Sequence, residues 1–332
     1  MEGMNLLHSI ISNPVHRRRP FRASRTLART ATAPPFLALL TAAALADWLV
    51  TRTATRLAIF IPKTPEMIAG YQWLNWIGQF GSTLGALTAL AGLSWIVREE
   101  WRTQRTPWLA AAIASLGGLS IVFLAAAPGA WLLGYYLLML IALFGLGGRS
   151  LRLVQPQTVR FAAFLPALAM MSAGLHQASP ALYAALNLPG PPMWSNQFYL
   201  GGECLVLAGA LAIWLAYGRG AGILAWLIAA LPAFGFASTY LFAPAMTATI
   251  VIWSNGLTLF LPWWVYALAL WLTGAALAQR FLAADRRTGW AIMLLAAAGY
   301  APQLSSQFHY GLIALWLLAL PPAAEAMDRD HV

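Results

Sequence analysis

A few polar side chains in this sequence stand within long apolar runs or at their ends, and they define the chemistry that the chain could carry. They are Asp47, Gln79, His176, Gln177, Glu203 and His309. Ionisable groups are costly inside a membrane and are kept there mainly for function. We therefore take these six residues as the candidate site.

Quinone chemistry suits these side chains better than a metal centre does. The single cysteine, Cys204, is interpreted as a helix-packing residue, and no H-x-x-x-H pair is present. A bis-histidine haem would need His176 and His309 to face each other, which makes haem a weaker alternative. A quinone needs hydrogen bonds to its two oxygens and a partner that exchanges protons in an apolar slot.

The roles within such a site follow from side-chain type. We predict that His176 and Glu203 exchange the protons, because burial can move their pKa values toward neutrality. Gln79 and Gln177 would position the ring, and Trp194 would form a wall. Asp47 and His309 complete the predicted quinone-binding set. No metal is predicted, and quinone is a substrate rather than a covalently bound cofactor.

Structural roles remain open for several of these residues. Asp47 could pair with Arg52 or face water, and Gln79 could form a hydrogen bond between two helices. His176 could simply face the membrane interface, and His309 could have a structural role. Glu203 could bond a neighbouring backbone group.

The elements that must position these residues are transmembrane helices. Of the 332 residues, 60% are hydrophobic and only 9% are charged, and the mean hydropathy is +0.67. Soluble proteins carry about 25% charged residues. Several apolar runs reach about 17 residues, roughly the length that crosses a bilayer. They lack the period-two alternation of a β-barrel. The predicted fold class is all-α, a polytopic transmembrane helical bundle.

Apolar runs and turn signals predict about ten spans between two short cytoplasmic tails, residues 1–34 and 323–332. The transmembrane domain is residues 35–322. Its spans are 35–57, 69–97, 108–127, 130–147, 160–178, 197–217, 221–241, 256–279, 288–302 and 307–322.

The net charge of +10 does not indicate nucleic-acid binding, because the basic residues crowd the N-terminal tail and the gaps between apolar runs. This distribution is the one produced by the positive-inside rule. Only Arg52, Arg56 and Lys63 would lie outside, so both termini are predicted to be cytoplasmic, in a bacterial inner (cytoplasmic) membrane. The basic stretch 17–21 could instead begin a twin-arginine or secretory signal.

This orientation places all six candidate residues in the outer third of the bilayer. The predicted outer loops 187–197 and 301–310 are nearly uncharged and rich in Pro, Trp, Asn and Gln. Such loops suit a docking surface for another protein. Residues 243–255 are predicted to be an outer loop or an interfacial helix.

Three stretches resemble the NrfD/PsrC-type family of quinone-interacting membrane subunits. WIGQFGSTLGALTAL (76–90) resembles that family's W-I-G…G-H-A-G-T helix, with Gln79 where a histidine is common. REEWRTQRT (98–106) resembles the basic segment that follows it. LHQASPALYAALNLPGPPMW (175–194) resembles the family's L-H-Q-S-S-L-G segment. The three stretches occur in family order within residues 76–194, a region that covers about a third of the chain.

The resemblance implies that quinol is bound near the outer face and that electrons pass to an iron–sulfur subunit docked there. A molybdopterin or cytochrome subunit often lies beyond it. The chain departs from the family at 123–136, which has neither a histidine nor an acid. The resemblance therefore does not extend to the transmembrane proton path proposed for some relatives.

The sequence thus predicts an integral membrane anchor subunit of a respiratory redox complex, in contact with membrane lipid and the quinone pool. The alternatives are a polytopic transporter, a lipid-modifying enzyme and a non-catalytic membrane scaffold. A transporter would usually place its polar groups near the midplane. A lipid-directed transferase would want more than the ten acids present in the chain.

Overall fold

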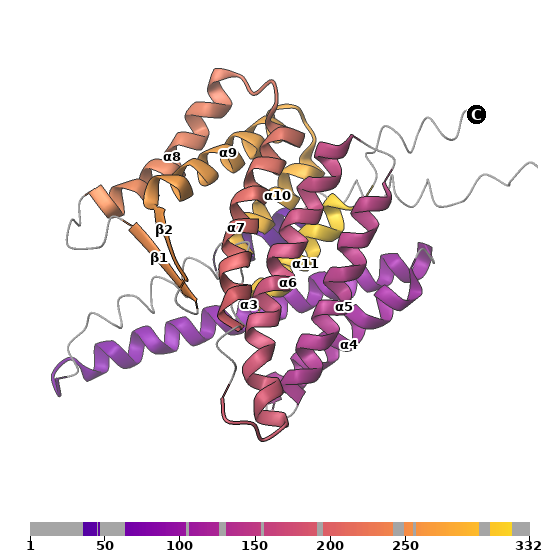
Figure 1. Cartoon of the computed structure of the whole chain (residues 1–332), viewed down its shortest axis with the longest axis vertical. Coiled ribbons are helices and arrows are strands. Elements are labelled where there is room, and N and C mark those ends of the chain that lie inside the picture. Colours follow the sequence, from indigo (N-terminus) through magenta and orange to yellow (C-terminus); the bar gives the residue numbers. More distant parts are fainter. Residues whose placement is uncertain are drawn as a thin grey trace, which may run out of the picture. The chain divides into compact units, whose positions relative to one another are not determined.

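The protein is helical apart from one strand pair in the part of the chain that its computed structural model describes (Figure 1). The described residues are 36–44, 46, 64–103, 106–125, 131–153, 156–190, 195–241, 249–254, 257–298 and 306–320. The first helices are α3 (Ile68–Thr103), α4 (Pro107–Ala125), α5 (Trp131–Arg152), α6 (Gln157–Ala185) and α7 (Ser195–Ile213). Then follow the π-helical turn η1 (Trp214–Gly218), α8 (Ile223–Leu241), α9 (Trp263–Leu282), α10 (Arg286–Ala298) and α11 (Ser306–Leu318). Residues 36–44 and 46 are also helical.

Five of the described helices are long and apolar enough to cross a membrane. They are Ile68–Thr103, Trp131–Arg152, Gln157–Ala185, Gln197–Gly218 and Trp264–Leu282. Two shorter apolar helices cover Pro107–Val122 and Phe308–Leu318. The prediction of a helical, membrane-embedded protein is confirmed at this level. The count of about ten spans and the cytoplasmic termini stay predictions.

One segment departs from the all-α prediction. Strand β1 (Thr249–Ser254) pairs antiparallel with β2 (Leu257–Pro262), with Ile252 opposite Leu259. The prediction of an outer loop or interfacial helix at 243–255 was therefore wrong for β1, and the span predicted from residue 256 begins as α9 at Trp263. Strand β1 is rich in β-branched residues, and an Asn–Gly pair stands between the two strands in the sequence, which favours a hairpin.

Helices α6 and α7 pack closely because glycines face the neighbouring helix. A Cβ on Gly202 would lie 3.6 Å from the carbonyl oxygen of Ala169, and one on Gly209 would lie 3.2 Å from Cγ of Pro166. Residue numbers rise along α7 while those of their partners fall along α6, so the two helices are antiparallel. Small residues at such contacts let helix backbones approach in a membrane.

Helix α11 fills the interior of the described bundle. Every residue from Phe308 to Leu320 is buried, and α11 packs against α3, α5, α6 and α10 (Figure 1). A helix that is apolar all round is expected in such a position. α11 therefore carries its two polar side chains of note, His309 and Trp316, into the core.

Candidate functional site

The α6–α7 pair brings His176 to the first turn of α7. The His176 Nδ1 atom lies 3.1 Å from the carbonyl oxygen of Ser195. One helical turn before His176, the Ser172 hydroxyl donates a hydrogen bond to the carbonyl oxygen of Phe198. These two bonds tie the C-terminal part of α6 to the start of α7 and hold the imidazole in place.

The bond to Ser195 determines how the neutral His176 ring is protonated. A carbonyl oxygen can only accept, so Nδ1 must carry the proton that it donates. The Nε2 atom of the neutral ring is then an acceptor with a free lone pair. The described residues give it no hydrogen-bond partner. The ring is only partly buried, so Nε2 can accept a proton from a bound hydroxyl group.

Tyr199 connects His176 with Glu203. Its ring centroid lies 5.6 Å from that of His176, and its hydroxyl is close enough to the Glu203 carboxylate to interact with it electrostatically. The hydroxyl of Tyr266, at the start of α9, donates to Glu203 Oε2 over 2.8 Å. The two residues that the sequence predicts as an acid–base pair thus lie on either side of one tyrosine. Tyr199 and Tyr266 themselves were not predicted.

The other predicted site residues are placed less directly. Gln177 is partly buried beside His176 on α6. Gln79 is exposed on α3, where its backbone carbonyl accepts a bond from Thr83, and its side chain makes no hydrogen bond among the described residues. Asp47 and Trp194 lie outside the described residues. Their roles stay predictions.

His309, on α11, contacts helices other than those that hold His176 and Glu203. It is only 3% exposed, and its Nε2 atom lies 3.0 Å from Ser120 Oγ on α4 and 3.2 Å from the Tyr135 hydroxyl on α5. Its Nδ1 atom has no hydrogen-bond partner among the described residues. The described contacts of His309 therefore connect α11 with α4 and α5, whereas those of His176 and Glu203 connect α6, α7 and α9.

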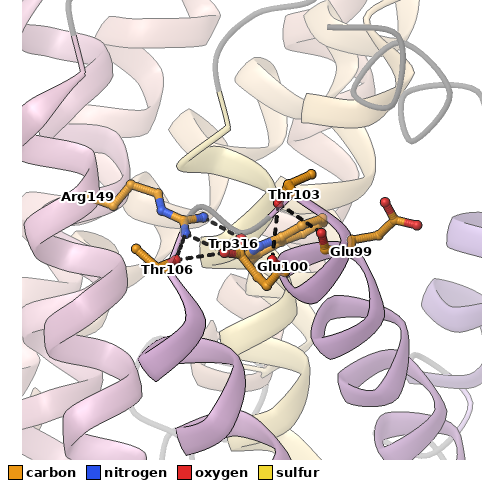
Figure 2. Close-up of polar contacts among 6 residues, drawn as sticks. All are labelled: Glu99, Glu100, Thr103, Thr106, Arg149 and Trp316. Carbon is orange, nitrogen blue, oxygen red and sulfur yellow. Dashed lines mark hydrogen bonds and ion pairs between the residues drawn. The ribbon is translucent and has the colours of Figure 1, made fainter. Parts of the chain in front are cut away.

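A second polar cluster, which the sequence did not predict, surrounds Glu100 near the end of α3. Figure 2 shows Arg149, Thr106 and Trp316 converging on this carboxylate. Arg149 donates from Nη1 to Oε1 over 2.7 Å and from Nη2 to Oε2 over 2.8 Å. Thr106 donates to Oε2 over 2.7 Å, and the Trp316 indole donates to Oε1 over 2.6 Å. All of these donors bond the Glu100 carboxylate, and Glu100 is only 1% exposed.

Both charged residues of this pair lie beyond the ends of the predicted spans 69–97 and 130–147. Helix α3 runs to Thr103 and α5 to Arg152, so Glu100 and Arg149 belong to helices. The signal was present in the sequence, because Glu100 follows Leu93 and Ile96 on the buried face at helical spacing. A charged residue can lie on the buried face of a helix when a residue of opposite charge pairs with it there.

Acids, histidines and the cysteine do not gather into a metal centre in the described part of the chain: no three of them lie close enough to hold an ion. The arrangement around Tyr199 instead places an imidazole, a carboxylate and two phenol groups near one another. The chain has no match among protein-family models, curated proteins or solved structures.

Proposed function

We propose that the protein is a membrane subunit that exchanges electrons and protons between quinone and an outer-face iron–sulfur partner. The observation that carries the proposal is the set His176, Tyr199, Glu203 and Tyr266: the Tyr199 ring lies between the two acid–base groups, and the Tyr266 hydroxyl bonds Glu203. A quinol ring offers two hydroxyl groups at opposite ends. A site that oxidises it needs a proton acceptor for each.

These residues account for both protons of the proposed reaction, and the partner takes the electrons. Oxidation of a quinol releases two protons and two electrons and leaves a quinone. His176 Nε2 accepts one proton, and Glu203, directly or through Tyr199, accepts the other. The electrons pass to the iron–sulfur partner. The reverse sequence reduces a quinone. Gln177 and Trp194 would position and cover the ring, as the sequence predicts.

The proposed orientation places this site at the outer face of about ten spans, with both termini in the cytoplasm of a bacterial cell. The basic residues between apolar runs support it. The nearly uncharged loops 187–197 and 301–310 would then form the surface on which the partner docks, with a molybdopterin or cytochrome subunit beyond it.

The decisive experiment measures quinol-dependent electron transfer in membranes, normalised to assembled protein. Glu203→Gln keeps the shape and the hydrogen bond from Tyr266 but removes the titratable proton, and His176→Ala removes the other acceptor. A general acid–base group contributes roughly 10²–10⁴-fold in rate, so we expect losses of that order. Glu66→Gln is the matched control, since Glu66 is an exposed glutamate before α3.

The strongest alternative is a non-catalytic scaffold that holds a partner complex together. It predicts that His176→Ala and Glu203→Gln transfer electrons at near-normal rates, and that result would refute the quinone site. A transporter predicts that the protein purifies without an iron–sulfur protein from cells that make all its partners.

A further inference from the structure

The inner end of α7 is capped by an arginine from α9. The turn η1 ends α7, and a Cβ on Gly218 would lie 3.3 Å from Cα of Ala276, so this turn packs tightly on α9. Arg280 donates from Nε to the carbonyl oxygen of Tyr217 over 3.0 Å, and its guanidinium lies 5.9 Å from the centroid of the Tyr217 ring. A cation at a helix C-terminus satisfies carbonyls that have no partner within the helix.

Two arginines share one carboxylate next to this cap. Arg280 Nη1 lies 3.8 Å from Asp285 Oδ2, and Arg287 is in electrostatic range of both Asp285 and Tyr217. Asp285 Oδ1 also accepts a bond from the backbone N–H of Thr288 at the start of α10. Burial lowers the pKa of the Arg287 guanidinium, with Asp285 offsetting part of this effect. Because two guanidinium groups share one carboxylate, the partly buried cluster carries excess positive charge.

The surrounding connections add cations and no further acid. Segments 214–223 and 280–290 contain Arg219 and Arg286 in addition, and both of these are exposed, while Asp285 is the one acid of the two segments. Because Arg280 bonds Tyr217, the connection after α7 and the connection after α9 lie next to each other. We name the cations of these two neighbouring connections the α7–α9 arginine junction: Arg219, Arg280, Arg286 and Arg287.

The neighbours of the arginine junction are apolar and exposed. Ile223 is 81% exposed, and Leu224 and Leu282 are more than half exposed. The two helices that end here, Gln197–Gly218 and Trp264–Leu282, are both long and apolar enough to cross a membrane. A ligand here would therefore meet cations at the helix ends and apolar side chains beside them, which is the pattern of an anionic amphiphile.

We propose that the α7–α9 arginine junction binds the phosphate headgroup of an anionic membrane lipid, whose acyl chains lie along the exposed apolar residues. The guanidinium groups would pair with the phosphate oxygens, and Asp285 would oppose binding by competing for the same cations. This site is separate from the proposed quinone site and does not depend on it.

The test is binding of fluorescent phosphatidylglycerol to the purified full-length protein in phosphatidylcholine nanodiscs. Arg287→Gln and the exposed Arg286→Gln should each weaken binding about fivefold. Asp285→Asn should tighten binding by a similar factor, and it leaves the start of α10 capped because Asn caps as well as Asp. Arg98→Gln, an exposed arginine on α3, is the matched control and should leave binding unchanged.

The opposite signs separate lipid binding from a structural role. If Asp285→Asn and Arg287→Gln both weaken binding, the cluster only holds the helices together and the proposal fails. The proposal also fails if neither arginine variant differs from Arg98→Gln. Competition with glycerol 3-phosphate distinguishes the source of the phosphate: displacement at equal concentration would identify a soluble anion and refute the lipid assignment.

Discussion

Arg149 forms a bidentate ion pair with Glu100, in which Nη1 and Nη2 each lie within 2.8 Å of a different carboxylate oxygen. The two side chains are 14% and 2% exposed. Thr106 and Trp316 occupy the remaining acceptor positions of the carboxylate, so α3, α5, α11 and the residue before α4 meet at a single buried charge. Such a pair is costly to break, because removing either partner leaves the other charged, buried and unpaired.

The first prediction concerns the stability of this pair. Glu100→Ala and Arg149→Ala should each destabilise the protein by about 3–5 kcal/mol. The double variant Glu100→Leu/Arg149→Met removes both charges together and should lose much less. Unfolding in detergent measures the effect, and Arg152→Ala, at an exposed arginine of α5, is the control. Single variants as stable as Arg152→Ala would contradict the buried ion pair.

The second prediction concerns the spacing of α6 and α7. A Cβ on Gly202 would stand at ordinary contact distance, 3.6 Å, from Ala169 and Ser172, so Gly202→Ala should be tolerated. Gly202→Leu overpacks the interface, which typically costs about 1–3 kcal/mol. It should also separate His176 from Tyr199 and lower quinol turnover per assembled protein. Equal turnover in the two variants would show that this spacing does not matter to the site.

The third prediction separates His309 from the site around Tyr199. Because its described bonds go to Ser120 and Tyr135, we expect His309→Leu to lower the free energy of unfolding by about 1–3 kcal/mol. Turnover per assembled protein should change far less than in His176→Ala. A loss of turnover as large as that of His176→Ala would instead support the sequence-based assignment of His309 to the quinone site.

The fourth prediction concerns orientation. The partition of basic residues predicts that a reporter fused at Val332 reports the cytoplasm and one inserted near Gly190 reports the outside. Gly190 has a φ of 73° and is exposed in a turn after α6, so an insertion there should not disturb the helices. Reporters that read on the same side would overturn the proposed placement of the quinone site at the outer face.

From the sequence, the positions of the helices could be predicted better than the side-chain contacts between them. Apolar runs fixed the cores of α4, α6 and α7 to within several residues, because burial in a membrane depends mainly on composition and length. The sequence also singled out His176 and Glu203, which the structure places on either side of Tyr199, and their roles stay predictions. The contact of Tyr266 with Glu203 could not be predicted, since nothing in a sequence says that the start of α9 meets the ninth residue of α7. The pairing of Glu100 with Arg149 could not be predicted for the same reason: the two charges meet only once α3 and α5 are packed.

The burial of α11 has a consequence for biosynthesis. The ribosome makes α11 after the other described helices, so the earlier helices must enter the membrane before the helix that fills their interior exists. Until α11 arrives, Glu100 lacks the Trp316 indole and Ser120 lacks the His309 ring. The nascent bundle must therefore persist with an open centre, in which chaperones or proteases could recognise the waiting polar groups before the final helix closes it.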